Sequence, residues 1–145
     1  MVSVKGIIAP IITPMYEDEM VNLDEFRNQV DRLIDSGIHG IFVFGTNGES
    51  YILSEEEKLE VIKTAVEQAA GRVPVYAGTG LNGTKDTIRF SLKAKELGVD
   101  ALSIITPGFA AASQDELYTH FKTVAEAVDL PIILYNIPAR TGNAI

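Results

Sequence analysis

Short runs of apolar residues alternate along this chain with longer amphipathic segments. The runs have the length of β-strands and are apolar at consecutive positions. Strands that are apolar on both faces are typical of parallel sheets buried on both sides. The pattern therefore predicts five parallel strands, near residues 6–8, 40–44, 74–77, 101–105 and 131–135.

The amphipathic segments carry signals for the start and end of helices. Three of them begin with Asn or Ser followed three residues later by Glu, which is the spacing of a capping box. Apolar residues then recur on one helical face. A glycine, which commonly ends a helix, follows three of the segments. The pairs are Asn22 with Glu25, Ser54 with Glu57 and Ser113 with Glu116, and the glycines are Gly37, Gly71 and Gly98.

The predicted order is a strand–helix unit repeated four times, followed by a fifth strand. Such alternation predicts an α/β fold with parallel pairing and right-handed crossovers. Two architectures fit this order: an open doubly wound sheet, and a partial TIM barrel. A complete barrel takes about 250 residues, whereas this chain has 145. No linker divides the chain, so residues 1–145 are expected to form one domain.

Composition and charge narrow the classes of function. The formal net charge is −8, which argues against nucleic acid and anionic membranes as partners, because both require clustered Lys and Arg. The chain has no cysteine, which excludes disulfides, a thiol nucleophile and thiolate metal ligands. The apolar runs have only strand length and no signal peptide is recognised, so the cytoplasm is the expected compartment.

Two polar segments follow predicted strands, where the loops build the site in either architecture. The first is Gly45-Thr46-Asn47-Gly48-Glu49-Ser50. Its glycines let the backbone turn and present bare amides, which suit a carboxylate. Thr46 and Asn47 add side-chain hydrogen-bond partners. The alternative interpretation is a glycine-rich turn in which Asn47 and Ser50 make only turn hydrogen bonds.

The second segment is Tyr135-Asn136-Ile137-Pro138-Ala139-Arg140-Thr141-Gly142. Together the two segments resemble the signature segments of the dihydrodipicolinate synthase and N-acetylneuraminate lyase family. Gly6 with Thr13-Pro14, and Ala77-Gly78-Thr79-Gly80, are also similar to that family. The resemblance covers the whole chain in the family's order, and it favours the barrel over the open sheet.

The resemblance implies a homotetrameric barrel that condenses pyruvate with an aldehyde, such as the aspartate semialdehyde of lysine biosynthesis, through a Schiff base on a lysine. Thr46 and Asn47 would hold the pyruvate carboxylate and pass protons. Tyr135 would act as general acid and base, and Arg140 would grip the carboxylate of the second substrate. These roles suit a phenol and a guanidinium. The alternatives are a packed strand-end aromatic for Tyr135 and a solvated loop charge for Arg140.

The remaining residues of the first segment are expected to support its loop. Gly45 and Gly48 would allow the turn, and Glu49 would hold the loop by hydrogen bonding. No metal or cofactor is expected. His39 and His120 have no ligand partner at metal spacing. The run from Glu55 to Glu57 opens a helix, where acids suit the helix dipole.

Three features depart from the family pattern. The family's Schiff-base lysine lies on the sixth strand, beyond the end of this sequence, and no lysine here is expected at a strand end or in the desolvated setting that a lysine nucleophile requires. Phe109 stands where dihydrodipicolinate synthases usually carry a tyrosine, and Asn47 replaces a second threonine. The lysines present are Lys5, Lys58, Lys63, Lys85, Lys93, Lys95 and Lys122.

The favoured hypothesis is a half barrel of a dihydrodipicolinate synthase-type lyase, inactive alone. A 2-keto-3-deoxy sugar acid aldolase, favoured by Phe109 and opposed by Arg140, stays open, as does a non-catalytic half-barrel with a role in folding or assembly. Unpaired sheet edges and exposed inward faces predict a homo-oligomer. The inward side chains are expected to include Ile41, Val43, Val75, Leu102 and Ile133.

One further motif is set aside. The segment from Gly78 to Gly83 fits the dinucleotide pattern G-x-G-x-x-G. That pattern also requires an acidic residue at the end of the next strand to bind the ribose. The next predicted strand, near residues 101–105, ends without an acid. NAD binding is therefore not expected.

Overall fold

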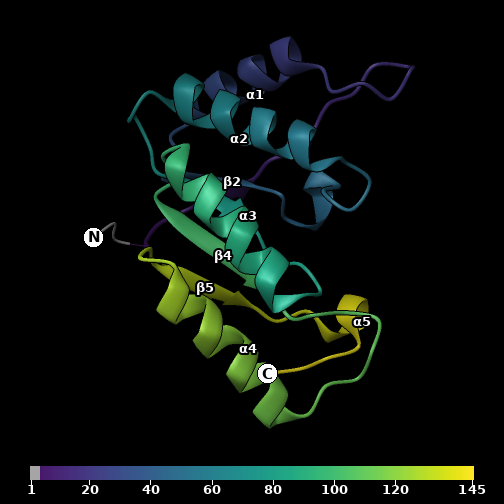
Figure 1. Cartoon of the computed structure of the whole chain (residues 1–145). Helices are drawn as coiled ribbons and strands as arrows, with labels where there is room; N and C mark the ends of the chain where they lie inside the picture. The colour runs from purple at the N-terminus through teal and green to yellow at the C-terminus, as the bar shows by residue number, and fades with distance from the viewer. Residues whose placement is uncertain (1–3) are drawn as a thin grey trace.

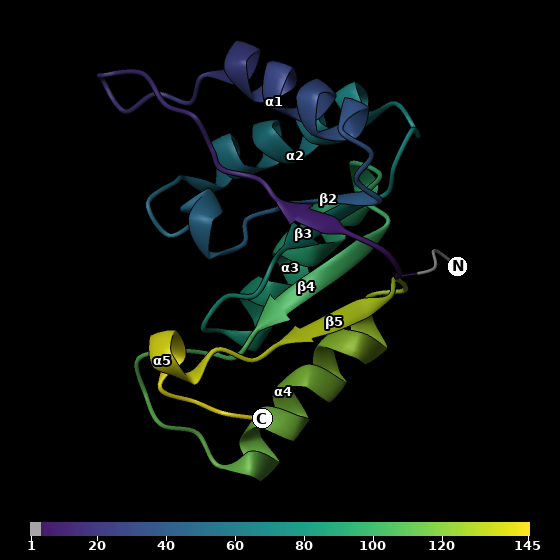
Figure 2. The same ribbon diagram turned by 180° about the vertical axis from the view of Figure 1, so that it is seen from behind.

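The computed structural model describes residues 4–145. Five parallel strands form one curved sheet in the order of the chain, and the four long helices lie along one face of it (Figures 1 and 2). The predicted α/β order, four strand–helix units and a fifth strand, is confirmed. The strands are β1 (Ile8–Pro10), β2 (Gly40–Val43), β3 (Val75–Gly78), β4 (Ala101–Ile105) and β5 (Ile132–Tyr135). The long helices are α1 (Leu23–Asp35), α2 (Glu55–Ala69), α3 (Thr84–Glu96) and α4 (Gln114–Ala127).

Boundaries differ from the predicted ones by one or two residues in β1, β2, β3 and β5, and backbone conformation explains the start of β1 and the end of β2. Gly6 has a φ of +77°, so the extended conformation begins after it and β1 starts at Ile8. Phe44 has a φ of +64°, which is left-handed, and β2 therefore ends at Val43. Apolar side chains alone carry no signal for these two turns in the backbone.

The predicted helix starts are largely confirmed. Ser54 with Glu57 and Ser113 with Glu116 form capping boxes in which side chain and backbone bond in both directions. Asn22 accepts a hydrogen bond from the backbone nitrogen of Glu25 at 2.9 Å. The Glu25 carboxylate, however, accepts from Asn28. The first cap is therefore only half of the predicted box. Beyond the helix ends, Gly37, Gly71 and Gly98 all have positive φ.

Side chains alternate between the two faces of the sheet. Ile41, Val43, Val75 and Leu102 are at most 2% exposed and lie in the core that the sheet forms with the helices. The opposite face, which we call the inner face, carries Ile8, Phe42, Tyr76, Ser103 and Ile133, which line a cavity of about 520 Å³. The expectation of inward side chains was therefore right for Ile133 and wrong for the other four. In strands that are apolar at every position, the sequence does not reveal which set faces inward.

The sheet is open at both edges. Within residues 4–145, β1 pairs only with β2, and β5 pairs only with β4. Ile7 beside β1 is 65% exposed and Leu134 in β5 is 48% exposed. These edges have the form expected of a partial barrel.

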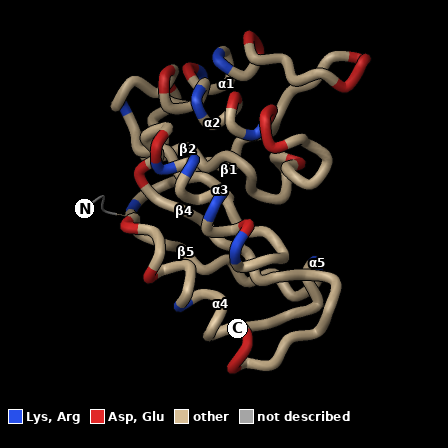
Figure 3. The backbone as a smooth tube through the Cα atoms, in the orientation of Figure 1, with Lys and Arg blue, Asp and Glu red and all other residues tan. Residues whose placement is uncertain are grey.

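Charged residues lie mainly on the helices and loops (Figure 3). Ion pairs join neighbouring helices: Arg72, just after α2, contacts Asp31 of α1, and Arg89 of α3 contacts Glu55 of α2. Considering residues 4–145, the structure has no helix long and apolar enough to cross a membrane.

Candidate active site

The first polar segment forms a tight turn after β2. Thr46–Gly48 adopt a short 3-10 helix, η1, in which the Gly48 nitrogen donates to the Gly45 oxygen at 2.9 Å. The hydroxyl of Thr13, from the segment after β1, donates to the Gly48 oxygen at 2.7 Å. Gly45 and Gly48 are both buried. These contacts are consistent with the predicted loop-support role of the two glycines.

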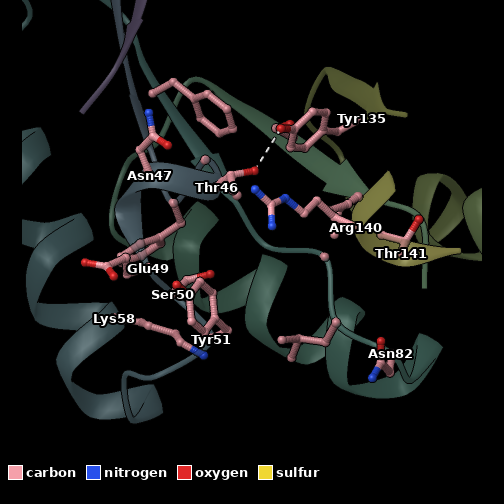
Figure 4. A pocket seen from close by; sticks show the side chains of 18 residues that line it. Thr46, Asn47, Glu49, Ser50, Tyr51, Lys58, Asn82, Tyr135, Arg140 and Thr141 are labelled. Carbon is pink, nitrogen blue, oxygen red and sulfur yellow. Dashed lines mark hydrogen bonds between the residues drawn. The ribbon is translucent and has the colours of Figure 1, made fainter. Parts of the chain in front are cut away.

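Glu49 completes this turn through its backbone. It caps η1 with a φ of +50°, and its nitrogen donates to the Thr46 oxygen. Its own carbonyl accepts from the nitrogen of Ile52 at 3.1 Å. The Glu49 carboxylate points away from the side chains of Thr46 and Tyr135 (Figure 4). Glu49 therefore shapes the loop while its charge lies away from those two hydroxyls.

The second polar segment leaves β5 at Tyr135 and forms a short helix, α5 (Pro138–Thr141). The apolar pattern of the sequence does not predict this helix. Pro138 in its first turn was the available signal, because proline is favoured at the first helical position. The Arg140 nitrogen donates to the Ile137 oxygen at 2.9 Å, and Gly142 ends the helix with a φ of +77°. The turn places Arg140 at the rim of the sheet.

The predicted substrate and catalytic residues meet in one cavity. The hydroxyl oxygens of Thr46 and Tyr135 lie 3.0 Å apart. Both residues line a cavity of about 760 Å³, together with Asn47 and Arg140. The guanidinium of Arg140 points toward Thr46 (Figure 4). Paired hydroxyls can relay a proton, and a guanidinium binds a carboxylate, so the arrangement suits proton transfer on a small anionic ligand.

The cavity also includes a lysine that the sequence analysis misjudged. Lys58, in α2, lines it alongside Tyr51 and Asn82. Burial lowers the pKa of the Lys58 ammonium, and the nearby Glu55 carboxylate opposes this effect. The expectation that no lysine occupies a desolvated setting was therefore wrong. The sequence signal that could have identified Lys58 is its position near the start of the helix that follows the first polar segment. In this fold the starts of such helices lie on the same side of the sheet as the carboxyl ends of the strands.

The glycines of the G-x-G-x-x-G segment and His39 have structural roles. A Cβ on Gly78 would lie 2.3 Å from the Phe44 oxygen, and one on Gly80 would lie 2.7 Å from the Ile105 nitrogen. Both glycines thus permit close backbone packing. His39 accepts from the Ile7 nitrogen at 3.0 Å, beside the start of β1. Within residues 4–145, no cluster of three His, Cys, Asp or Glu could hold a metal ion.

Comparison with protein families gives one match that covers nearly the whole chain. A family model described as "Dihydrodipicolinate synthetase family" matches residues 3–145. The 4-hydroxy-tetrahydrodipicolinate synthase of Nitrosospira multiformis is 49% identical over 140 residues, which are 97% of this chain and 47% of that protein. The enzyme of the same name from Methylococcus capsulatus is 48% identical, over 96% of this chain and 48% of its own length. The chain spans about half the length of the curated relatives it matches.

Solved structures show the same relationship. The chloride-inhibited dihydrodipicolinate synthase of Acinetobacter baumannii, complexed with pyruvate, superposes with a TM-score of 0.96 at 42% identity, over 98% of this chain and 49% of that one. The Aquifex aeolicus dihydrodipicolinate synthase gives 0.93 at 44% identity, over 97% and 47%. YagE of E. coli K12, a prophage protein solved with pyruvate, gives 0.93 at 35% identity, over 97% and 47%. These likenesses confirm a half barrel and exclude the open doubly wound sheet.

Proposed function

The chain belongs to the dihydrodipicolinate synthetase family, and from this premise we propose that it supplies the pyruvate-binding half of a lyase site of the dihydrodipicolinate synthase type. The observation that carries the proposal is the 3.0 Å contact between the hydroxyls of Thr46 and Tyr135, in a cavity that Arg140 also lines. The ligand is pyruvate or another small keto acid. The cytoplasm stays the proposed compartment.

Each residue has a proposed role that follows from its chemistry. Thr46 and Asn47 bind the keto acid's carboxylate, and the backbone of the turn around Gly45 and Gly48 holds them in place. Tyr135 moves protons, because its hydroxyl already contacts that of Thr46 and can donate and accept. Arg140 binds the carboxylate of an aldehyde such as aspartate semialdehyde through parallel hydrogen bonds. The cations that line the cavity, Arg140 and Lys58, favour such anionic ligands.

The covalent step has no evident nucleophile among the described residues. None of the five strands carries a lysine at its carboxyl end, and Lys58 lies on helix α2. We therefore propose that the Schiff-base lysine comes from outside this sequence and that the chain is inactive alone. Tyr135 and Thr46 would move protons for the reaction on that lysine.

A 2-keto-3-deoxy sugar acid aldolase is the second candidate. Phe109 favours it, since this side chain has no hydroxyl and is fully exposed on the loop after β4. Arg140 opposes it, because a sugar aldehyde offers no second carboxylate. A non-catalytic half-barrel that serves folding or assembly is the third candidate, and the open inner face favours it.

Titration of the chain with pyruvate tests the proposal. In 15N NMR spectra we expect saturable shifts at the amides of Thr46 and Asn47, with lactate as a control that keeps the carboxylate but lacks the keto group. Weaker binding of lactate would support a keto-acid site. Saturable shifts confined to other segments, or no saturation with pyruvate, would overturn the proposed site and favour the non-catalytic half-barrel.

The proposed assembly is a homo-oligomer formed through the open parts of the sheet. The unpaired edges of β1 and β5 offer backbone hydrogen bonds, and the inner face offers apolar surface at Ile8, Phe42 and Ile133. A two-fold dimer that pairs like surfaces is the commonest arrangement of this kind.

A further inference from the structure

Asn143 joins two segments that are far apart in the sequence. It follows α5 and is only 4% exposed. Its side-chain nitrogen donates to the backbone oxygens of Pro107 and Ala110, at 2.7 and 2.8 Å. Its side-chain oxygen accepts from the backbone nitrogen of Ala112 at 2.8 Å. One carboxamide thus satisfies three backbone groups of the loop between β4 and α4, and its own donors and acceptor are all used.

The neighbouring polar groups strengthen this connection. Thr106, directly after β4, and Thr141, in α5, bring their hydroxyl oxygens within 2.8 Å of each other. The backbone oxygen of Asn143 lies within hydrogen-bonding distance of both hydroxyls, 3.3 Å from that of Thr106 and 3.0 Å from that of Thr141. The other side of the loop is held by Asn82, whose side-chain oxygen accepts from the Gly108 nitrogen at 2.9 Å. The loops after β3, β4 and β5 are therefore joined into one unit.

This unit carries part of the candidate site. Thr141 and Arg140 line the larger cavity, and Arg140 is three residues before Asn143. The Arg140 side chain is itself exposed, and α5 is only four residues long. A single turn of helix has little stability of its own, so the direction of Arg140 depends on what holds the segment after it. Among the described contacts, the three part-buried hydrogen bonds of the Asn143 side chain join this segment to the loop after β4, beside the contact between Thr106 and Thr141.

We infer that Asn143 is a positioning residue: it fixes the Arg140 segment against the loop after β4 and so sets where the Arg140 guanidinium lies relative to the hydroxyls of Thr46 and Tyr135. The inference rests on the proposed function for the role of Arg140, but the structural link itself does not. Loss of the carboxamide leaves three partly buried backbone groups of the loop without this partner, which favours rearrangement of both segments.

The test compares Asn143→Ala with Gln114→Ala. Gln114 is the matched control, because its exposed side chain donates to the backbone oxygen of Ala144 at 2.8 Å rather than to a backbone group of the loop after β4. In 15N relaxation we expect the order parameters of the Gly108 and Arg140 amides to stay near about 0.85 in Gln114→Ala and to fall toward about 0.6 in Asn143→Ala. Both amides keep their own acceptors in the variant, so a change reports positioning.

Ligand titration then connects the link to the site. With succinic semialdehyde, an aldehyde that carries a carboxylate, we expect Asn143→Ala to weaken binding about tenfold or more, while pyruvate binding is retained. Arg140→Ala should give the same pattern, and the double variant should lose no more than either single variant, since both changes act on one interaction. A purely structural loss would weaken both ligands together and would overturn the inference.

Two further outcomes keep the inference separate from the proposed function. If Arg140→Ala binds succinic semialdehyde like the unsubstituted chain, the proposed role of Arg140 fails, and the order parameters alone decide the positioning role. If Asn143→Ala does not fold, Asn143→Asp replaces it, because the carboxylate still accepts from Ala112 but cannot donate to Pro107 or Ala110. Unchanged order parameters and unchanged ligand affinities in the folded variant would overturn the inference.

Discussion

The hydroxyl oxygens of Thr46 and Tyr135 lie 3.0 Å apart, at the edge of the curved sheet where the carboxyl ends of the strands lie. Thr46 follows β2 and Tyr135 ends β5, and the sheet order places β3 and β4 between those strands. In a flat sheet, three strand spacings would separate the two strands by about 14 Å. The contact therefore depends on the curvature of the barrel, and an open flat sheet would not form it.

Replacement of Thr46 by Val should remove pyruvate binding and leave the fold intact. The substitution deletes the hydroxyl that contacts Tyr135 at an exposed loop position, so the free energy of unfolding should change by no more than about 0.5 kcal/mol. Thr123→Val is the matched control, because Thr123 is exposed and its hydroxyl donates to the Thr119 oxygen within α4. Calorimetry that found equal pyruvate affinity in Thr46→Val and Thr123→Val would place the site elsewhere.

Incubation with pyruvate and borohydride should yield no covalent adduct on the chain. A Schiff base requires a lysine whose amine reaches the ligand in its neutral form. Lys58 is the lysine that comes closest to meeting this requirement, since it lines the cavity and burial lowers its pKa. Intact mass spectrometry is the measurement. A stoichiometric reduced adduct, absent in Lys58→Met, would show that α2 carries the nucleophile and that the chain is not inactive alone.

The sequence predicted the five strands, the four long helices and the two polar segments that line the candidate cavity, but not the short helices η1 and α5. The other failures concern geometry that apolar runs do not encode. Ile41 and Leu102 were assigned to the wrong face, because strands apolar at every position give no alternation from which to read the faces. Lys58 was missed because its position on a helix indicates a place in the cavity only when the start of that helix is known to lie at the site. The contact between Thr46 and Tyr135 depends on sheet curvature, and Asn143 depends on a loop path; neither has a local sequence signal.

The ion pairs of Glu55 should make a small contribution to stability that is lost in acid. Hydrogen bonds from Arg89 and Lys93 hold the pKa of the Glu55 carboxyl at about 2, below its ordinary value of 4.5. A depressed carboxyl pKa adds stability that is complete above the unfolded-state value and disappears as the pH falls toward about 2. Because the groups are partly exposed, we expect about 0.2–1 kcal/mol.

Urea unfolding of Glu55→Gln and the unsubstituted chain at pH 7 and at pH 2 measures this contribution. The free energies of unfolding should differ at pH 7, and the difference should shrink at pH 2, where the carboxyl in the folded chain is about half protonated. Glu56→Gln is the control, because it removes a charge from the same helical turn but not from the pairs with Arg89 and Lys93, and its difference at pH 7 should be smaller. A difference for Glu55→Gln as large at pH 2 as at pH 7 would contradict the assigned cause.

Gly78→Ala should destabilise the fold markedly. The added Cβ would lie 2.3 Å from the backbone oxygen of Phe44, so β3 and the turn after β2 must move apart. Overpacking of this kind costs about 1–3 kcal/mol. Gly48→Ala is the control, because its nearest contact would be an ordinary 3.4 Å from the Ile11 oxygen. Equal unfolding free energies for the two variants would show that the close approach at Gly78 relaxes without cost.

Self-association should depend on the inner face of the sheet. Within residues 4–145 the outer edges of β1 and β5 are unpaired, and the inner face lines a cavity of about 520 Å³. Burial of apolar surface stabilises by about 25 cal/mol per Å², so several hundred Å² of contact rivals the ~5–15 kcal/mol stability of a domain.

We expect Ile133→Lys, on the inner face, to shift the chain toward monomer, because the interface would have to bury an unpaired charge. Tyr118→Lys, at an exposed position of α4, is the control and should not change the fraction of monomer. Sedimentation equilibrium is the measurement, and a folded 15.7 kDa monomer of the unsubstituted chain at micromolar concentration would contradict the assembly.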